Sequence, residues 1–186
     1  MENYNLTLFS PPKVEPISPD EAVSYMRLDT PDATESAYIS DCIKAAREYC
    51  EDYQHRAYIT QTWELTLQQF PTAENDRMNN CQQTDEIKIP KGCLQSIDSF
   101  TFTDYAGTVN TLVQGENFVV STRGILGRIV PPYAIIWPTN PLSPLDPIVV
   151  RFTCGYGDTA DQIPLKVKQA MYMLSLIHIS EPTRPE

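Results

Sequence analysis

Several carboxylates lie close together in one stretch of the chain and could in principle do acid–base chemistry or bind a divalent cation. They are Asp41, Glu48, Glu51 and Asp52. They fall within residues 33–54, where Lys44 and Arg47 precede Glu48 and Glu51 by the i,i+4 spacing of helical ion pairs. Because nothing in the sequence sets an apolar pocket opposite these carboxylates, the pattern favours a solvated, salt-bridged helix face over a catalytic or metal site.

A nucleophile–base pair or a zinc site would need cysteines and histidines in closely spaced sets. The five cysteines contain no C-x-x-C motif, and Cys42 and Cys50 are too far apart on one helix to form a disulfide. His55 follows Cys50 by five residues, but nothing completes a ligand set or a triad. The cysteines are therefore interpreted as reduced thiols of a cytosolic compartment, and no catalytic residue, metal or cofactor is expected.

Two further motifs have a functional and a structural interpretation. The stretch GYGDTA, residues 155–160, lacks the spacing of a nucleotide-binding loop, so its glycines are expected to permit a tight turn after a strand. Trp63, Trp137 and the ten tyrosines could build a sugar-binding or base-stacking surface. Because they are scattered through predicted strands and loops, they are expected instead to fill the core and subunit contacts.

Composition limits the class of protein that the chain can be. Its 186 residues fit one domain, and 41% hydrophobic with 20% charged residues is typical of a globular protein. The net charge of −10 argues against a grip on nucleic acid, which needs a surplus of lysine and arginine. There is no apolar run long enough for a membrane span, and the first residues have no signal-peptide pattern.

Capping signals place two helices near the N-terminus, after an extended arm over residues 1–17. Ser18, Pro19 and Glu21 form a capping box that begins a helix at 19–28. A second helix is predicted at 33–54, capped by Thr30 or Asp32 and ending at Gln54 or His55 without a glycine. Its apolar stripe is wider than one side of a surface helix needs, so either the helix is sandwiched inside the domain or it also contacts another subunit. The candidate interface residues are Tyr38, Ile39, Cys42, Ile43, Tyr49 and Tyr53.

In the remainder of the chain, apolar and polar residues alternate with the period of half-buried strands. Residues 57–156 are predicted to form an antiparallel β region with short connections, and the run 148–152 has the composition of a central strand. Pro164 then opens a last helix over 164–173. The sequence therefore predicts an α+β fold, a single domain over 18–173 with helices bracketing an antiparallel β region.

Four phrases stand out along the chain: the opening helix SPDEAVSYMRLD, the helix with A-A-R-x-x-x-E, the strand Q-T-W-x-L-x-L and the later V-x-F-x-x-G-Y-G. Together with the order of the predicted elements, these phrases resemble the head–tail connector (adaptor) family of long-tailed bacteriophages. The match extends over roughly residues 15–173. Nine residues of this chain match the family's motifs, and the resemblance implies a structural role for them. These family-motif residues are Arg47, Glu51, Arg56, Gln61, Thr62, Trp63, Gly155, Tyr156 and Gly157.

The resemblance implies a structural virion protein rather than an enzyme. Such proteins form a homo-oligomeric ring, commonly of twelve copies, in the neck of the particle beneath the portal protein. They extend the DNA channel and present a surface to the next neck (stopper) protein. DNA is expected to pass through without specific binding, and assembly is expected in the bacterial host cytoplasm. An alternative from another class is a β-rich carbohydrate- or host-binding module of a phage particle.

The last residues, LSLIHISEPTRPE at 174–186, do not continue the pattern that precedes them. Back-translation of LSLIHISEPTR resembles, base for base, the adapter used in transposase-based sequencing libraries. We therefore expect residues 174–186 to be an adapter-derived artefact, with the native helix cut near Met173. For this reason His178 carries no functional argument.

Overall fold

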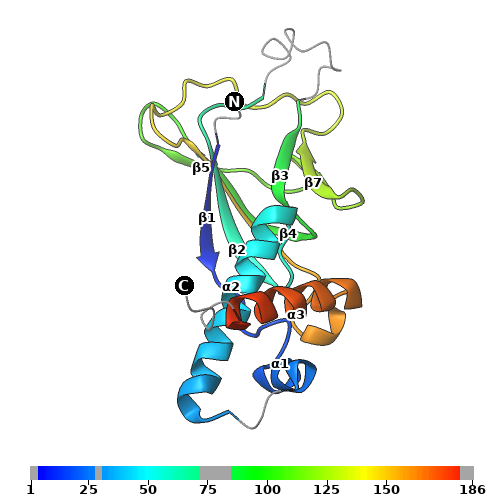
Figure 1. Ribbon diagram of the computed structural model, residues 1–186. Helices are drawn as coiled ribbons and strands as arrows, with labels where there is room; N and C mark the ends of the chain where they lie inside the picture. Colours follow the sequence, from blue (N-terminus) through cyan, green and yellow to red (C-terminus); the bar gives the residue numbers. More distant parts are fainter. Residues whose placement is uncertain (1–3, 28–30, 72–84, 181–186) are drawn as a thin grey trace. The chain divides into compact units, whose positions relative to one another are not determined.

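Helices and strands separate into two parts of the chain in the computed structural model (Figure 1). The structure describes residues 4–27, 31–71 and 85–180, with side chains up to residue 175. The β unit comprises residues 1–11 and 61–154, and the helical unit comprises residues 12–60 and 155–186. The predicted α+β class with antiparallel strands is confirmed. Both units draw on residues of the range 18–173, and the single domain predicted over that range stays a prediction.

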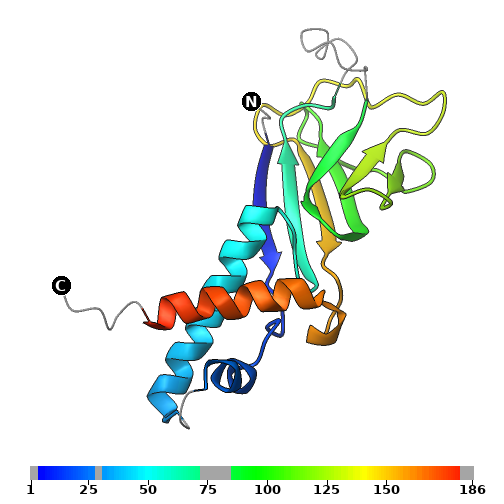
Figure 2. The same ribbon diagram turned by 45° about the vertical axis from the view of Figure 1, so that its right-hand side comes forward.

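The helical unit contains helices α1 (Pro19–Met26), α2 (Ala33–Gln54) and α3 (Leu165–Ser180), with a short 3-10 turn at Ala160–Gln162. Figure 2 shows α3 crossing α2. Helix α1 begins at a capping box in which Ser18 Oγ accepts a hydrogen bond from Glu21 N and Glu21 Oε2 accepts one from Ser18 N. Asp32 and Glu35 form the same box before α2. Both predicted helix starts are thus confirmed.

The ends of the helices differ in how well the sequence anticipates them. Helix α2 ends at Gln54 as predicted, and His55 adopts the left-handed conformation with φ 51°. Helix α1 ends at Met26, so its predicted end at residue 28 is wrong, because Arg27 adopts the left-handed conformation with φ 54° and its N–H donates to the carbonyl oxygen of Ser24. Helix α3 continues past Met173 to Ser180, into the segment interpreted as adapter-derived. Because apolar residues such as leucine and isoleucine fit a helix whatever their origin, this extent does not test that interpretation.

The core of the helical unit gathers side chains from both ends of the chain. Its buried members are Ile17, Ala22, Ile39, Ile43, Cys50, Tyr58, Ile59, Ile163 and Met171. Because α3 and the 3-10 turn bring their residues from beyond position 155, the unit is completed only after the whole β unit has been crossed. No helix in the described ranges is both long and apolar enough to span a membrane.

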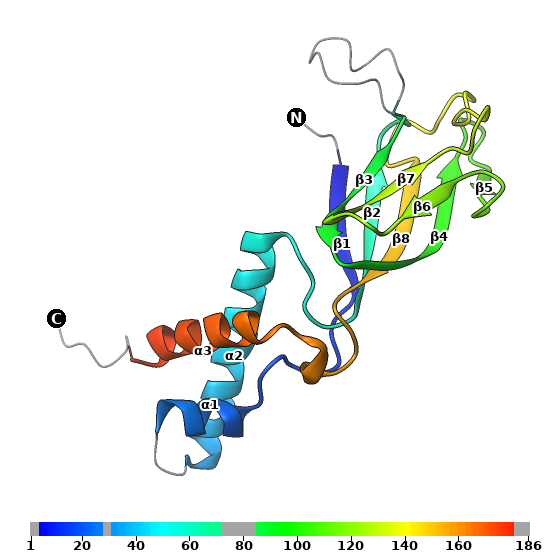
Figure 3. The ribbon, with the colours of Figure 1, turned by 90° about the vertical axis from the view of Figure 1, so that its right-hand side faces the viewer.

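The β unit holds two antiparallel sheets that pack together (Figure 3). The larger sheet has the order β1-β2-β8-β4-β5, and the smaller has the order β3-β7-β6. The strands are β1 (Tyr4–Ser10), β2 (Gln61–Leu67), β3 (Ile87–Gly92), β4 (Leu94–Thr103), β5 (Val109–Thr111), β6 (Val119–Ser121), β7 (Leu126–Val130) and β8 (Ile148–Cys154). Strand β8 lies between β2 and β4, so its predicted central position is confirmed. The predicted N-terminal arm supplies edge strand β1, which pairs with β2.

Aromatic rings fill the space between the two sheets. Phe70 stacks on Trp137 with ring centroids 5.3 Å apart, and Phe100 of β4 contacts Phe118 at 5.2 Å. The indole Nε1 of Trp137 donates to the carbonyl oxygen of Asp85 at 2.8 Å. Trp137 is thus a core residue, as one of the two sequence interpretations expected. Residues 72–84, which belong to the predicted β region, lie outside the described residues.

Candidate functional site

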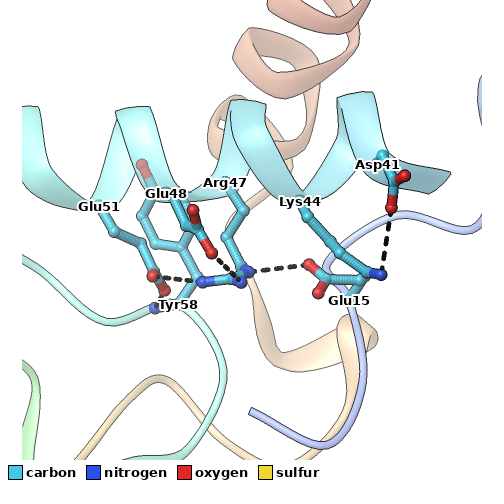
Figure 4. A network of polar contacts seen from close by, with 7 residues as sticks. All are labelled: Glu15, Asp41, Lys44, Arg47, Glu48, Glu51 and Tyr58. Atoms are coloured by element: carbon cyan, nitrogen blue, oxygen red, sulfur yellow. Dashed lines mark hydrogen bonds and ion pairs between the residues drawn. The ribbon is translucent and has the colours of Figure 1, made fainter. Parts of the chain in front are cut away.

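A buried network of charged side chains on α2 is the most distinctive polar feature of the helical unit (Figure 4). Arg47 is only 6% exposed, and its guanidinium donates to Glu15 Oε2 through Nε and to Glu51 Oε2 through Nη1, both at 2.8 Å. Glu51, 3% exposed, also accepts a hydrogen bond from the backbone N–H of Tyr58 at 2.7 Å. The more exposed Glu48 approaches the same guanidinium at 3.3 Å. The arginine is therefore surrounded by carboxylates on three sides.

The carboxylates of this network hold the Arg47 guanidinium in its charged form. Desolvation of the buried guanidinium lowers the pKa of Arg47, but the negative charges of Glu51 and Glu15 outweigh it, so the pKa lies above its usual value. Beside the network, burial raises the pKa of the Tyr58 hydroxyl, and the neighbouring Cys50 and Glu51 add to the shift. An arginine with a raised pKa neither gives up nor takes a proton, so the arrangement suits a structural role rather than acid–base catalysis.

The network fastens the segments through which the chain enters and leaves the helical unit. The chain passes between the units after Pro11, after Thr60 and after Cys154. Glu15 lies just after the first of these passages, and Tyr58 lies just before the second. Through Glu15 and through the backbone of Tyr58, Arg47 and Glu51 therefore tie two of the three connecting segments to α2.

The third connecting segment is tied to the second. Arg56 Nη1 donates to the Tyr156 hydroxyl at 3.1 Å, and Tyr156 N donates to the carbonyl oxygen of Tyr58 at 3.1 Å. Thr60 N donates to the carbonyl oxygen of Gly157 at 2.9 Å. All three connecting segments are thus joined to one another and to α2 within the helical unit.

Gly155 is required where the second and third connecting segments touch. Its φ is +142°, and a β-carbon built there would lie 2.6 Å from Thr60 N. At Gly157 a β-carbon would collide with the Gln162 side chain. Gly155 therefore permits close backbone approach directly after β8, which agrees with the turn predicted from sequence.

The structure brings together six of the nine family-motif residues predicted from the sequence. They are Arg47, Glu51, Arg56, Gly155, Tyr156 and Gly157, all in the helical unit. The other three lie on β2, where Gln61 is buried, Thr62 Oγ1 is 3.3 Å from Thr153 Oγ1, and the Trp63 ring lies under Lys91 Nζ. Sequence reasoning missed Glu15 and Tyr58. No local signal marks Glu15, because its partner is 32 residues away.

The six candidate interface residues of α2 divide into two groups. Ile39, Cys42 and Ile43 are buried within the helical unit, so their apolar surface is already covered. Tyr38, Tyr49 and Tyr53 are exposed by 46%, 61% and 80%. The wide apolar stripe is therefore partly core and partly an exposed tyrosine face, a name used below for these three residues. Their role at an interface stays a prediction.

The described residues contain no cluster of three or more histidine, cysteine, aspartate or glutamate side chains that could hold a metal ion. Cys42, Cys50, Cys93 and Cys154 form no disulfide, and Cys81 lies outside the described residues.

Comparison with known proteins finds the same fold in solved structures of gene transfer agent particles. No protein-family model matches the chain, and no curated protein is significantly similar to it in sequence. A chain in the neck of an empty gene transfer agent particle, computed with C6 symmetry, aligns with a TM-score of 0.77 and 18% identity over 98% of this chain and 86% of that one. A chain of the virion of the native gene transfer agent particle aligns with a TM-score of 0.73 and 17% identity, over 97% of this chain and 87% of that one. A chain in the neck of the native particle, computed with C12 symmetry, aligns with a TM-score of 0.63 and 17% identity, over 96% of this chain and 86% of that one. At this identity the likeness establishes a shared fold.

Proposed function

We propose that this chain is a structural protein of the neck of a phage-like particle, a head–tail connector of the adaptor type that assembles into a ring. The observation that carries the proposal is the fold, which matches chains of gene transfer agent necks over nearly the whole length of this one. The buried ion-pair network supports it, because its residues fasten chain segments together and none is poised for proton transfer. An enzymatic role has no comparable support.

The exposed tyrosine face of α2 is the contact that we propose between neighbouring copies. Tyr49 and Tyr53 follow Tyr38 by eleven and fifteen residues, so at about 100° per residue the three lie within about 60° of one another around the helix. Tyrosine is enriched at protein interfaces, where its ring buries apolar area and its hydroxyl finds a polar partner. The C6 and C12 symmetries of the structural neighbours are consistent with a homo-oligomeric ring, and twelve copies is the number that we propose.

The position within the neck follows from the same proposal. The ring would dock beneath the portal protein, extend the DNA channel and present its far side to the next neck protein. The net charge of −10 supports a channel wall that repels DNA and lets it slide. An electrophoretic mobility assay at low salt should accordingly show no retention of duplex DNA, whereas salt-sensitive binding would contradict this part of the proposal.

Assembly is the decisive test. Mass photometry and negative-stain microscopy of the purified chain should show closed rings, and the portal protein of the same particle should co-purify with them. Tyr49→Ser combined with Tyr53→Ser should weaken assembly, whereas Tyr105→Ser, which changes a 79% exposed tyrosine of the β unit, should not. Strict monomers that bind glycans would refute the connector and favour the carbohydrate-binding alternative.

A further inference from the structure

A shallow hollow in the helical unit combines two carboxylates with a stacked pair of tyrosines. It has a volume of about 460 Å³ and is lined by Asp20, Glu21, Ser24, Tyr25 and Tyr172. The lining comes from α1 and α3, which pack against each other in the helical unit. The function proposed above makes no use of this hollow.

The aromatic pair gives the hollow a defined chemistry. The rings of Tyr25 and Tyr172 are 4.7 Å apart between centroids and 17° from parallel, and Tyr25 is 46% exposed. The negative faces of such rings attract cations, above all where carboxylates stand nearby. Burial raises the pKa of Tyr172, and the negative charge of Glu21 adds to the shift, so the ring lies within the field of that carboxylate. The hollow therefore offers apolar ring surface beside negative charge, which together suit the aliphatic stem and the ammonium group of a lysine.

The chain itself supplies a suitable cation on another face of α3. Lys166 is exposed in the first turn of that helix, six residues before Tyr172, which puts the two about 120° apart around the helix axis. In a ring, each copy uses two different surfaces, and one surface of a copy contacts the other surface of its neighbour. The first turn of α3 also lacks an acidic residue, although a lysine at a helix N-terminus is disfavoured by the helix dipole. A carboxylate partner on a neighbouring copy would offset that penalty.

We propose that the hollow formed by Asp20, Glu21, Tyr25 and Tyr172 receives the Lys166 side chain of a neighbouring copy. This inference rests on the proposed ring and names one of its contacts. It is separate from the tyrosine face of α2, because none of the lining residues belongs to that helix. Because both partners are near the surface, the contact weakens as salt is added.

The first test measures the hollow alone and does not need a ring. N-acetyl-lysine methylamide is titrated into the full chain labelled with 3-fluorotyrosine, and ¹⁹F NMR follows the resonances of Tyr25 and Tyr172, assigned through Tyr25→Phe and Tyr172→Phe. We expect saturable shifts of these two signals, with affinity lowered about fivefold to tenfold by Asp20→Asn combined with Glu21→Gln. Glutamine can fill the same place in a capping box, so α1 keeps its start.

The matched control is Glu35→Gln combined with Asp41→Asn. It neutralises the corresponding capping-box glutamate and one exposed aspartate on α2, and the change in net charge is the same. Binding of the probe should be unchanged in this variant. Equal affinity in the control and in the hollow variant, or shifts spread over all tyrosines, would overturn the inference.

The second test uses assembly, scored by mass photometry as a function of protein and salt concentration. Asp20→Asn combined with Glu21→Gln should raise the concentration needed for assembly about tenfold, Lys166→Gln should do the same, and the two together should add little more. Rings that form normally in these variants would overturn the inference and leave the proposed function intact. If even the unchanged chain forms no ring, the proposed function fails, and absence of probe binding in the first test would then separately reject the hollow.

Discussion

Removal of the Glu51 carboxylate is the most direct test of the polar network on α2. Glu51 accepts from Arg47 Nη1 at 2.8 Å and from Tyr58 N at 2.7 Å, and its side chain is 4% exposed. Hydrogen bonds to charged groups contribute about 1.5–3 kcal/mol each, and breaking a buried ion pair costs about 3–5 kcal/mol. Two terms reduce the loss. Arg47 keeps Glu15, and the carboxylate stands near the negative end of the helix dipole, which disfavours it by up to about 1 kcal/mol.

We therefore expect Glu51→Ala to lower the free energy of unfolding of the helical unit by about 3 kcal/mol. For a chain of this length that corresponds to a fall of roughly 6–12 °C in Tm. Urea denaturation followed by circular dichroism at 222 nm measures it, because every helix of the described residues belongs to the helical unit.

The matched control is Glu48→Ala, which removes another carboxylate from the same arginine. Glu48 lies 3.3 Å from Arg47 and its side chain is 67% exposed, so solvent screening limits the expected loss to about 1 kcal/mol or less. A third variant, Arg47→Met combined with Glu51→Leu, removes both buried charges and should cost less than Glu51→Ala alone. If Glu51→Ala were no more destabilising than Glu48→Ala, or if the double variant cost the most, the assigned role of the network would be refuted.

Three further changes test other parts of the structure. Gly155→Ala should lower the free energy of unfolding by about 2–4 kcal/mol, because the new β-carbon would lie 2.6 Å from Thr60 N at a φ of +142°. The control Gly107→Ala, at positive φ but in open space, should lower it by about 1 kcal/mol, and urea denaturation measures both. The raised pKa of Tyr58 means that the folded state holds this proton more tightly, so its contribution is present below about pH 10 and is lost at higher pH at up to about 1.4 kcal/mol per pH unit. Tyr58→Phe should make the curve of stability against pH flatter above that pH, and an unchanged slope would contradict the raised pKa assigned to Tyr58. Trp137→Phe keeps a ring in the aromatic core but loses the indole hydrogen bond, so it should lower stability by about 1–2 kcal/mol, and no change in the urea midpoint would contradict the bond.

The starts of α1 and α2 could be predicted from sequence because the signals that set them are local. Asp32 and Glu35 satisfy the first N–H groups of α2, and both lie within one turn of its start. The same holds for Ser18 and Glu21 at α1. The end at His55 was predicted from the close of the apolar pattern, although no glycine marks it. The apolar composition of the run 148–152 likewise predicted the central strand β8 correctly.

The division into two units could not be read from the same patterns. It depends on contacts between segments far apart in the chain, such as β1 with β2, and on α3 joining α2 after the entire β unit. The apolar stripe of α2 shows the same limit. Periodicity identified which residues are apolar, but not that Ile39 and Ile43 would be covered within the chain while Tyr53 would stay exposed. Exposure depends on what packs against a helix, and this information is not local.

The candidate site lies between these two cases. The i,i+4 pair of Arg47 and Glu51 was visible in the sequence, but it was interpreted as part of a solvated helix face. The structure corrects that interpretation, because both side chains are almost fully buried. Glu15 and the Tyr58 backbone supply the partners that make burial tolerable.

A buried ion pair of this kind needs a reason beyond stability, because well-packed apolar residues of similar volume stabilise a fold at least as well. Charged groups add hydrogen bonds of defined geometry, which apolar contacts do not provide. Arg47 offers donors at fixed angles, so Glu15 can meet it in few positions, and Glu51 receives Tyr58 N with its second oxygen. The connecting segments are thereby held at one register on α2. The ring proposed above would need this uniformity, because each of its copies must present identical surfaces. The double variant of Arg47 and Glu51 distinguishes the two roles, since it should retain most of the stability while giving a broader spread of assembled species in mass photometry; rings as uniform as those of the unchanged chain would show that the network serves stability alone.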